Sequence, residues 1–163
     1  MLNQNEVDLV YTLDTHIYDR NYITASEEEV SVHFVASSES PLAARKQVSA
    51  EKLISCPAIL TEKNVSYRKL LDEYLASHSL ELLPYLEIGD TSLICSMVEA
   101  GMGISFLPDF VTEASVRAGR MIRFCGTGDF CVLFGSRCFI TGKNGFHRKC
   151  RRLWNICIGL EKR

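Results

Sequence analysis

The sequence predicts an α/β domain built on a mainly parallel sheet. Short β-prone runs alternate with helix-like segments four times between residues 58 and 124, and strands that alternate with helices in this order usually pair in parallel. Helix-capping side chains and glycines separate the segments where such elements should begin and end. Apolar residues make up 47% of the 163 residues and charged residues 23%, a composition that excludes a disordered or collagen-like chain.

The first third of the chain predicts two strands and a short helix. Residues 7–13 form a β-rich run, and residues 30–36 alternate in polarity, so both are expected to be strands. The polar stretch between them, residues 14–29, is expected to be a loop. Residues 49–54 predict a short helix with Ser49 as its N-cap.

The rest of the domain alternates regularly. Strands are expected at 58–61, 84–88, 104–107, 121–124 and 130–132, and helices at 66–77, 90–100 and 108–118. Ser66 and Asp90 are expected to cap the first two of these helices, and Gly101 and Gly119 to end the last two.

Two polar clusters follow predicted strands and begin predicted helices. In parallel sheets, ligands bind beyond the carboxyl ends of the strands, beside helix N-termini that attract anions. The predicted site therefore comprises hydroxyl, amide and capping groups, with two apolar residues as a wall: Thr61, Asn64, Ser66, Tyr67, Asp90, Thr91, Ser92, Ile104 and Phe106. Arg68 could add a charge for the ligand or be solvated. Plain helix capping explains the polar residues equally well, and both interpretations remain open.

Other chemistry finds little support in the sequence. Gly101-Met-Gly103 follows a predicted helix and precedes a strand, the reverse of a dinucleotide-binding motif. The seven cysteines include no Cys-x-x-Cys pair, and His147-x-x-Cys150 alone is too small a set for zinc. No nucleophile or acid–base set stands out. We therefore expect no metal, no cofactor and no enzymatic activity.

The beginning of the chain has neither the basic start nor the apolar core of a signal peptide, and no apolar stretch approaches the ~18 residues of a membrane span. A cytoplasmic location without membrane partners is the expectation.

The net charge of −2 hides two unlike segments. Residues 1–132 carry ten Lys/Arg against nineteen Asp/Glu, whereas residues 133–163 carry eight Lys/Arg and the single acid Glu161. Five of the seven cysteines also lie in the last 43 residues. The basic run at 148–152, beside Trp154, could contact phosphates, although charge alone is a weak signal.

Residues 91–119 resemble the effector-binding domain of LysR-type transcriptional regulators. The most specific part is the pattern Val98-x-x-Gly101-x-Gly103-Ile104-x-x-Leu107-Pro108. Three further segments occur in the order of the family, at residues 6–10, 38–43 and 53–60, so that the resemblance covers residues 5–132.

This resemblance implies a fold like that of type II periplasmic binding proteins, with two lobes and a small-molecule effector between them. It also implies a homo-oligomer that controls transcription. The family's winged helix-turn-helix and the first part of its first lobe have no counterpart in this sequence. We therefore expect a truncated domain: a remnant of the first lobe at 1–36, a complete second lobe at 37–132, and an atypical basic tail at 133–163.

The tail suggests a shifted reading frame. The family normally closes with a strand and a long helix, which residues 133–163 do not resemble. Back-translation with common codons, read from the last base of the Phe134 codon, can produce a strand-like Val-Leu-Tyr. Ser, Pro and apolar residues at near-helical spacing follow it. The alternative is a genuine basic tail.

The predicted function is reversible binding of a small, anionic metabolite by a regulator's effector domain, with DNA contacted only through the missing helix-turn-helix. The alternatives are a solute-binding receptor of the same fold and a basic-tailed interaction protein.

Overall fold

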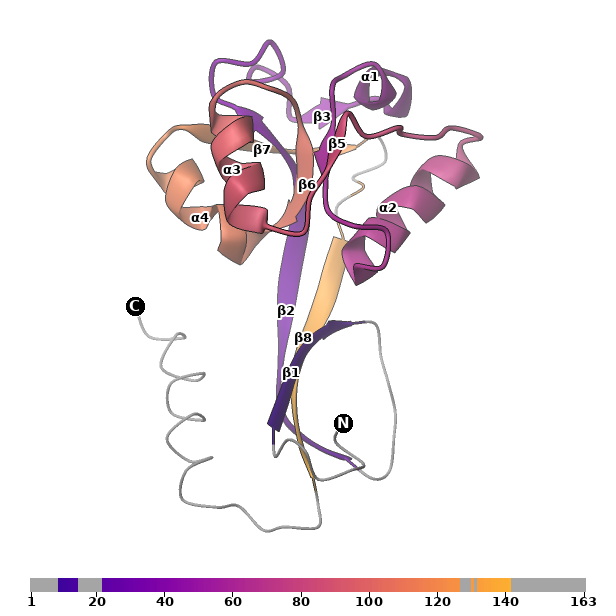
Figure 1. Ribbon diagram of the computed structural model, residues 1–163, viewed down its shortest axis with the longest axis vertical. Coiled ribbons are helices and arrows are strands. Elements are labelled where there is room, and N and C mark those ends of the chain that lie inside the picture. The colour runs from indigo at the N-terminus through magenta and orange to yellow at the C-terminus, as the bar shows by residue number, and fades with distance from the viewer. Residues whose placement is uncertain (1–8, 15–21, 127–129, 131, 142–163) are drawn as a thin grey trace. The chain divides into compact units, whose positions relative to one another are not determined.

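The computed structural model describes residues 9–14, 22–126, 130 and 132–141 (Figure 1), and side-chain surroundings are described for residues 29–126 and 130. The chain forms two compact units, Met1–Glu28 with Gly135–Arg163, and Glu29–Phe134. The sequence predicted lobe boundaries at 36/37 and 132/133. The basic run at 148–152 and the His147-x-x-Cys150 pair lie outside the described residues.

In the first unit, strand β1 (Leu9–Asp14) pairs antiparallel with strand β8 (Val132–Thr141), with Leu9 opposite Ile140 and Asp14 opposite Gly135. β1 agrees with the strand predicted there. β8 was not expected at this length, because the sequence predicts a strand only at 130–132 and an atypical basic tail from residue 133. Its Val, Leu, Phe and Ile residues have the high β-propensity that a paired strand needs.

The second unit is an α/β layer structure. Its strands are part of β2 (Tyr22–Ser37), with β3 (Gln47–Val48), β4 (Ile59–Leu60), β5 (Leu86–Glu87), β6 (Ser105–Pro108) and β7 (Met121–Gly126). Its helices are α1 (Ala50–Ile54), α2 (Ser66–Ser77), α3 (Thr91–Glu99) and α4 (Asp109–Arg117). Each helix follows a strand, and the alternation between residues 58 and 124 predicted this for α2, α3 and α4.

The strands of this unit run mostly in one direction. β3 is parallel to β7, and β4 is parallel to β5. A parallel bridge between Ala58 and Ile104 joins β4 to β6. β2 alone runs the other way, antiparallel to both β6 and β7. The helices that follow β3, β4, β5 and β6 therefore all begin at the same edge of the sheet, which we call the carboxyl edge.

Hydrophobic cores cover both faces of the sheet. α3 and α4 lie together on one face and α2 lies on the other (Figure 1). The first core contains Val35, Ile94, Val98 and Leu107. The second is aromatic, with Phe34 at its centre: the Phe34 ring lies 4.8 Å from that of Phe106 and 5.7 Å from that of Phe124. Successive residues of a strand point to opposite faces, so Phe34 and Val35 serve different cores.

Three details differ from the sequence prediction. β2 begins at Tyr22, inside the stretch expected to be a loop. The polar residues of this stretch led to the prediction of a loop, although it begins with the β-prone sequence Tyr-Ile-Thr. A strand can form there because backbone pairing does not depend on side-chain polarity. The two-residue strand β3 was missed because it is too short to show periodicity. Ser66 does not cap α2: the N-cap is Val65, and Ser66 is the first helical residue.

No helix in the part of the chain that the structure describes has both the length and the apolarity needed to cross a membrane.

Candidate functional site

The two predicted polar clusters meet at the carboxyl edge. β4 and β5 are adjacent and parallel, with Leu60 opposite Glu87, so the segments that follow them emerge side by side. The contact is close, because a Cβ added to Gly89 would lie 3.3 Å from Glu62 Oε1. The turn that precedes α2 therefore lies against the turn that precedes α3.

The starts of these two helices differ chemically. The Asp90 carboxylate caps α3 and accepts hydrogen bonds from the N–H groups of Ser92 (2.8 Å) and Leu93 (3.2 Å). At α2, the N-cap Val65 has no side-chain acceptor to offer. The first N–H groups of a helix have no partner within the helix and carry a partial positive charge. An external anion is thus favoured at the start of α2, while the Asp90 carboxylate disfavours one at the start of α3.

Several predicted residues present polar groups at this edge. Asn64 and Ser92 are exposed, and Ser66 and Thr91 are half-buried. Ser66 has a hydroxyl at the first position of α2, directly beside the uncapped N-terminus. These four residues can contact a ligand without rearrangement of the turns.

Thr61 and Tyr67 lie beneath this surface. Thr61 is 3% exposed, and its hydroxyl makes no hydrogen bond of normal geometry within the described residues. Burial raises the pKa of Tyr67, and the nearby Thr61 side chain partly opposes that effect. A ligand at the surface would therefore contact these two side chains only if the turn opened.

Ile104 and Phe106 do not form an apolar wall at this edge. The pairing of Ile104 with Ala58 places it at the amino end of β6, on the opposite side of the sheet from the helix starts. Phe106 is 1% exposed and packs in the aromatic core, where its ring lies 5.8 Å from that of Phe130. The sequence predicted that both residues lie in a strand. It did not show the position of each residue along the strand or the face of the sheet to which its side chain points.

Arg68 supports the site from within. Its side chain is only 2% exposed, which contradicts the expectation of a solvated or ligand-binding cation. The guanidinium pairs with Asp72 (3.0 Å) and Glu87 (3.5 Å), and its Nη1 donates to the carbonyl oxygen of Thr61 (2.8 Å). Because Thr61 follows β4 and Glu87 ends β5, Arg68 holds the two strand ends together.

A second charged cluster at the carboxyl edge was not predicted. His33 Nδ1 lies 2.7 Å from Asp109 Oδ1, and Arg123 Nε lies 3.2 Å from the same oxygen. Arg123 also pairs with Glu113 at 3.0 Å. His33 and Asp109 are 76 residues apart, so no local motif could have revealed the pair. The cluster ties β2 and β7 to the start of α4.

The family model and the curated relatives that match this chain describe the same kind of protein. The sequence model described as "LysR substrate binding domain" matches residues 1–127. Among curated proteins, the HTH-type transcriptional regulator YwqM of Bacillus subtilis is 30% identical over 121 residues, which are 74% of this chain and 41% of the relative. MetR of Escherichia coli is 32% identical over 126 residues, 74% of this chain and 38% of the relative. The chain thus spans less than half the length of these relatives.

Solved structures agree at the level of the fold. The CcmR regulatory domain of Synechocystis, solved in complex with 2-PG, has a TM-score of 0.78 and 16% identity, covering 99% of this chain and 76% of that one. The bromide-bound regulatory domain of HypT from Salmonella typhimurium has a TM-score of 0.76 and 16% identity, covering 99% and 75%. These neighbours confirm the predicted periplasmic-binding-protein-like fold.

Proposed function

Because the chain belongs to the LysR substrate-binding domain family, we propose that it senses a small anionic metabolite on behalf of a transcription regulator, by reversible binding and without catalysis. The observation that carries this proposal is the uncapped start of α2 at the carboxyl edge. A carboxylate, phosphate or sulfate group there would accept hydrogen bonds from the helix N–H groups and interact favourably with the helix dipole.

The residues proposed to contact the anion are Asn64 and Ser66, with Thr91 and Ser92 of the adjacent turn beside them. Arg68 acts indirectly, since its hydrogen bond to the Thr61 carbonyl oxygen keeps the turn before α2 in place. Because the Asp90 carboxylate repels an anion at the start of α3, the anionic group of the ligand is expected to bind at the start of α2. The regulator is further proposed to work in the cytoplasm as an oligomer that contacts DNA through a helix-turn-helix of the kind named in its relatives.

The proposal is tested by giving α2 its own anionic cap. Val65→Asp places a carboxylate where the external anion would bind and should stabilise the helix by about 1 kcal/mol. The full chain is titrated calorimetrically with 2-PG, the ligand of the CcmR neighbour, and with sulfate, phosphate and small carboxylates. We expect binding of at least one anion and about tenfold weaker binding in Val65→Asp, from the added negative charge and the occupied N–H groups.

The matched control is Asp90→Asn, which keeps a capping side chain at α3 but removes its charge. It should preserve the affinity or increase it. If no anion of the panel binds, or if Val65→Asp binds as tightly as the unmodified chain, the start of α2 is not the site.

We also propose that residues 133–163 are encoded in a shifted frame. The family match ends at residue 127, shortly before the change in charge and cysteine content, which supports this proposal. The coding DNA across Val132 to Phe134, compared with that of a close relative, decides the matter. A continuous frame without a single-base deletion would refute the proposal.

A further inference from the structure

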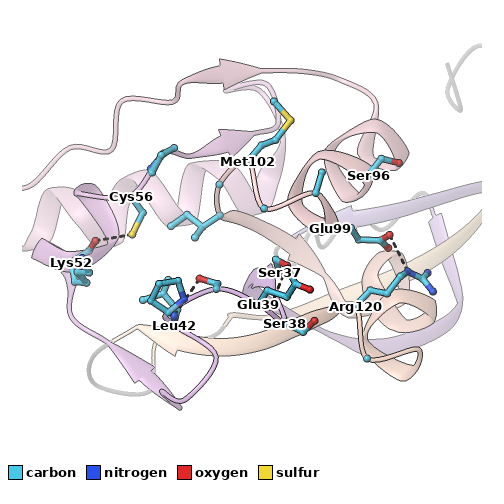
Figure 2. A pocket seen from close by; sticks show the side chains of 18 residues that line it. Ser37, Ser38, Glu39, Leu42, Lys52, Cys56, Ser96, Glu99, Met102 and Arg120 are labelled. Atoms are coloured by element: carbon cyan, nitrogen blue, oxygen red, sulfur yellow. Dashed lines mark hydrogen bonds and ion pairs between the residues drawn. The ribbon is translucent and has the colours of Figure 1, made fainter.

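A large pocket lies at the edge of the second unit opposite the proposed anion site. It has a volume of about 1000 Å³ and is formed by four loops, which follow β2, α1, α3 and α4 (Figure 2). Ile104 lines it, and Ile104 pairs with Ala58 at the amino end of β4. The pocket is therefore separated from the helix starts by the length of the strands.

Backbone contacts hold the walls of this pocket in place. The N–H of Ile104 donates to the carbonyl oxygen of Pro57 at 2.8 Å, and the N–H of Ser38 donates to that of Arg120 at 3.0 Å. Gly103 passes so close to Pro57 that a Cβ would lie 2.4 Å from its carbonyl oxygen. Such a pocket is largely formed before a ligand arrives, which lowers the entropic cost of binding.

One pair of charges in the pocket is already satisfied. Arg120 Nε lies 3.0 Å from Glu99 Oε2, and the hydroxyl of Ser115 donates to the other carboxylate oxygen of Glu99. These hydrogen bonds, with that of Ser115 the larger cause, hold the pKa of Glu99 below its ordinary value. The pair closes one end of the pocket and leaves little free charge there for a ligand (Figure 2).

Two other charged residues that line the pocket have no such partner. Neither the Lys52 ammonium nor the Glu39 carboxylate forms an ion pair with any residue in the described part of the chain, and both residues are exposed. Residues of α1 and α3 line the same pocket, together with the turn that follows α4. Among its described lining residues, the pocket thus offers one cation, Lys52, and one anion, Glu39, that form no ion pair.

Apolar side chains line the same pocket. Leu42 and Ile104 line the pocket and are buried, whereas Met102, which also lines it, is 47% exposed. Figure 2 shows Leu42 and Met102 among the lining side chains. A ligand with only an anionic group would leave Glu39 uncompensated, and one with only a cationic group would leave Lys52 uncompensated. A ligand with both charges and an apolar side chain matches all three features.

We propose that this pocket is a second ligand site, which binds a small zwitterion of the free amino acid class. The carboxylate of the ligand pairs with Lys52, its ammonium pairs with Glu39, and its side chain covers Leu42 and Met102. The site is independent of the anion site at α2.

The full chain is titrated calorimetrically with L-alanine, L-valine, L-leucine, L-methionine and L-phenylalanine. For the tightest of these, taking L-leucine as the example, two analogues that lack one charge are compared: isoamylamine and 4-methylpentanoate. We expect each analogue to bind about tenfold more weakly than the amino acid, the usual scale for a lost charge-assisted hydrogen bond.

Substitutions at two exposed residues test which side chain binds each charged group of the ligand. Lys52→Met should weaken binding of the amino acid about tenfold and leave that of the amine unchanged. Glu39→Gln should weaken binding of the amino acid and leave that of the carboxylate unchanged. Lys69→Met, at an exposed lysine outside the pocket, is the matched control and should change nothing.

The proposal is overturned if none of the five amino acids binds at 10 mM, about the weakest affinity such a site could usefully have. It is equally overturned if the amine or the carboxylate binds as tightly as the amino acid, or if Val65→Asp rather than Lys52→Met weakens binding of the amino acid. Val65→Asp tests only the anion site, so the failure of either site is recognised separately.

Discussion

Replacement of Gly103 by alanine should destabilise the domain more than the same change at Gly101, two residues earlier. A Cβ at position 103 would lie 2.4 Å from the carbonyl oxygen of Pro57 and 3.1 Å from its carbonyl carbon, whereas ordinary contacts begin at 3.4 Å. Both atoms belong to the backbone, so rotation of a side chain cannot relieve the clash. The two segments would have to separate by about 1 Å to restore ordinary contact.

That separation acts on a hydrogen bond that links β4 to β6. The N–H of Ile104 and the carbonyl oxygen of Pro57 are 2.8 Å apart, and a further ~1 Å exceeds hydrogen-bonding distance. The neighbouring bond, from the N–H of Ile59 to the carbonyl oxygen of Ile104 at 2.9 Å, shares the same backbone. Losing one such bond and weakening the other near the core costs about 3 kcal/mol of unfolding free energy.

Gly101→Ala is the matched control. Gly101 has a φ of +75° but nothing within 4 Å of an added Cβ, so only the left-handed backbone is unfavourable there, at about 1 kcal/mol. Urea unfolding followed by far-ultraviolet circular dichroism gives both values. Equal losses for the two alanines would refute the conclusion that close packing of the backbone demands glycine at position 103.

Three further outcomes are expected. Ser105→Ala should raise the unfolding free energy by about 1 kcal/mol, because the Ser105 hydroxyl is buried without a hydrogen-bond partner among the described residues; a less stable variant in thermal melts would contradict this. Iodoacetamide should alkylate Cys95 far more slowly than Cys56, since burial, and to a smaller extent Glu99, raises the pKa of the Cys95 thiol. Peptide mass spectrometry measures both alkylation rates, and comparable rates for the two cysteines would contradict this prediction. Glu99→Gln should be less stable than the unmodified chain at pH 7, and the difference should begin to shrink near pH 4.5 and disappear at lower pH. Hydrogen bonds, chiefly from Ser115, lower the pKa of Glu99, so its contribution is present above the unfolded pKa and is lost as pH falls through the folded one; a pH-independent difference would argue against that role.

Local signals in the sequence predicted most elements of the second unit. Ser49 and Asp90 cap α1 and α3 as expected, because capping requires only an acceptor a few residues from the N–H it binds. Gly101 and Gly119 end α3 and α4 with positive φ values, also as expected. The resemblance to the LysR family rested on the same region and is confirmed.

The predictions about the site were less complete. The sequence identified the two turns that meet at the carboxyl edge, since the order of strands and helices places them there. It did not show that Asp90 already occupies the start of α3, while α2 begins without a cap. Nor did it show that Arg68 is buried, because a cation on a helix usually reaches solvent and only its contacts with Asp72 and Glu87 reveal otherwise.

By itself, the sequence determined where the helices begin and end, the α/β class and the family, because capping, periodicity and glycine positions act over a few residues. Only the tertiary structure decided that Ile104 lies at the edge away from the helix starts, that His33 meets Asp109, and that Lys52 and Glu39 line one pocket. These facts depend on strand register and on loops distant in the sequence, and both follow from the packing of the whole domain rather than from neighbouring residues.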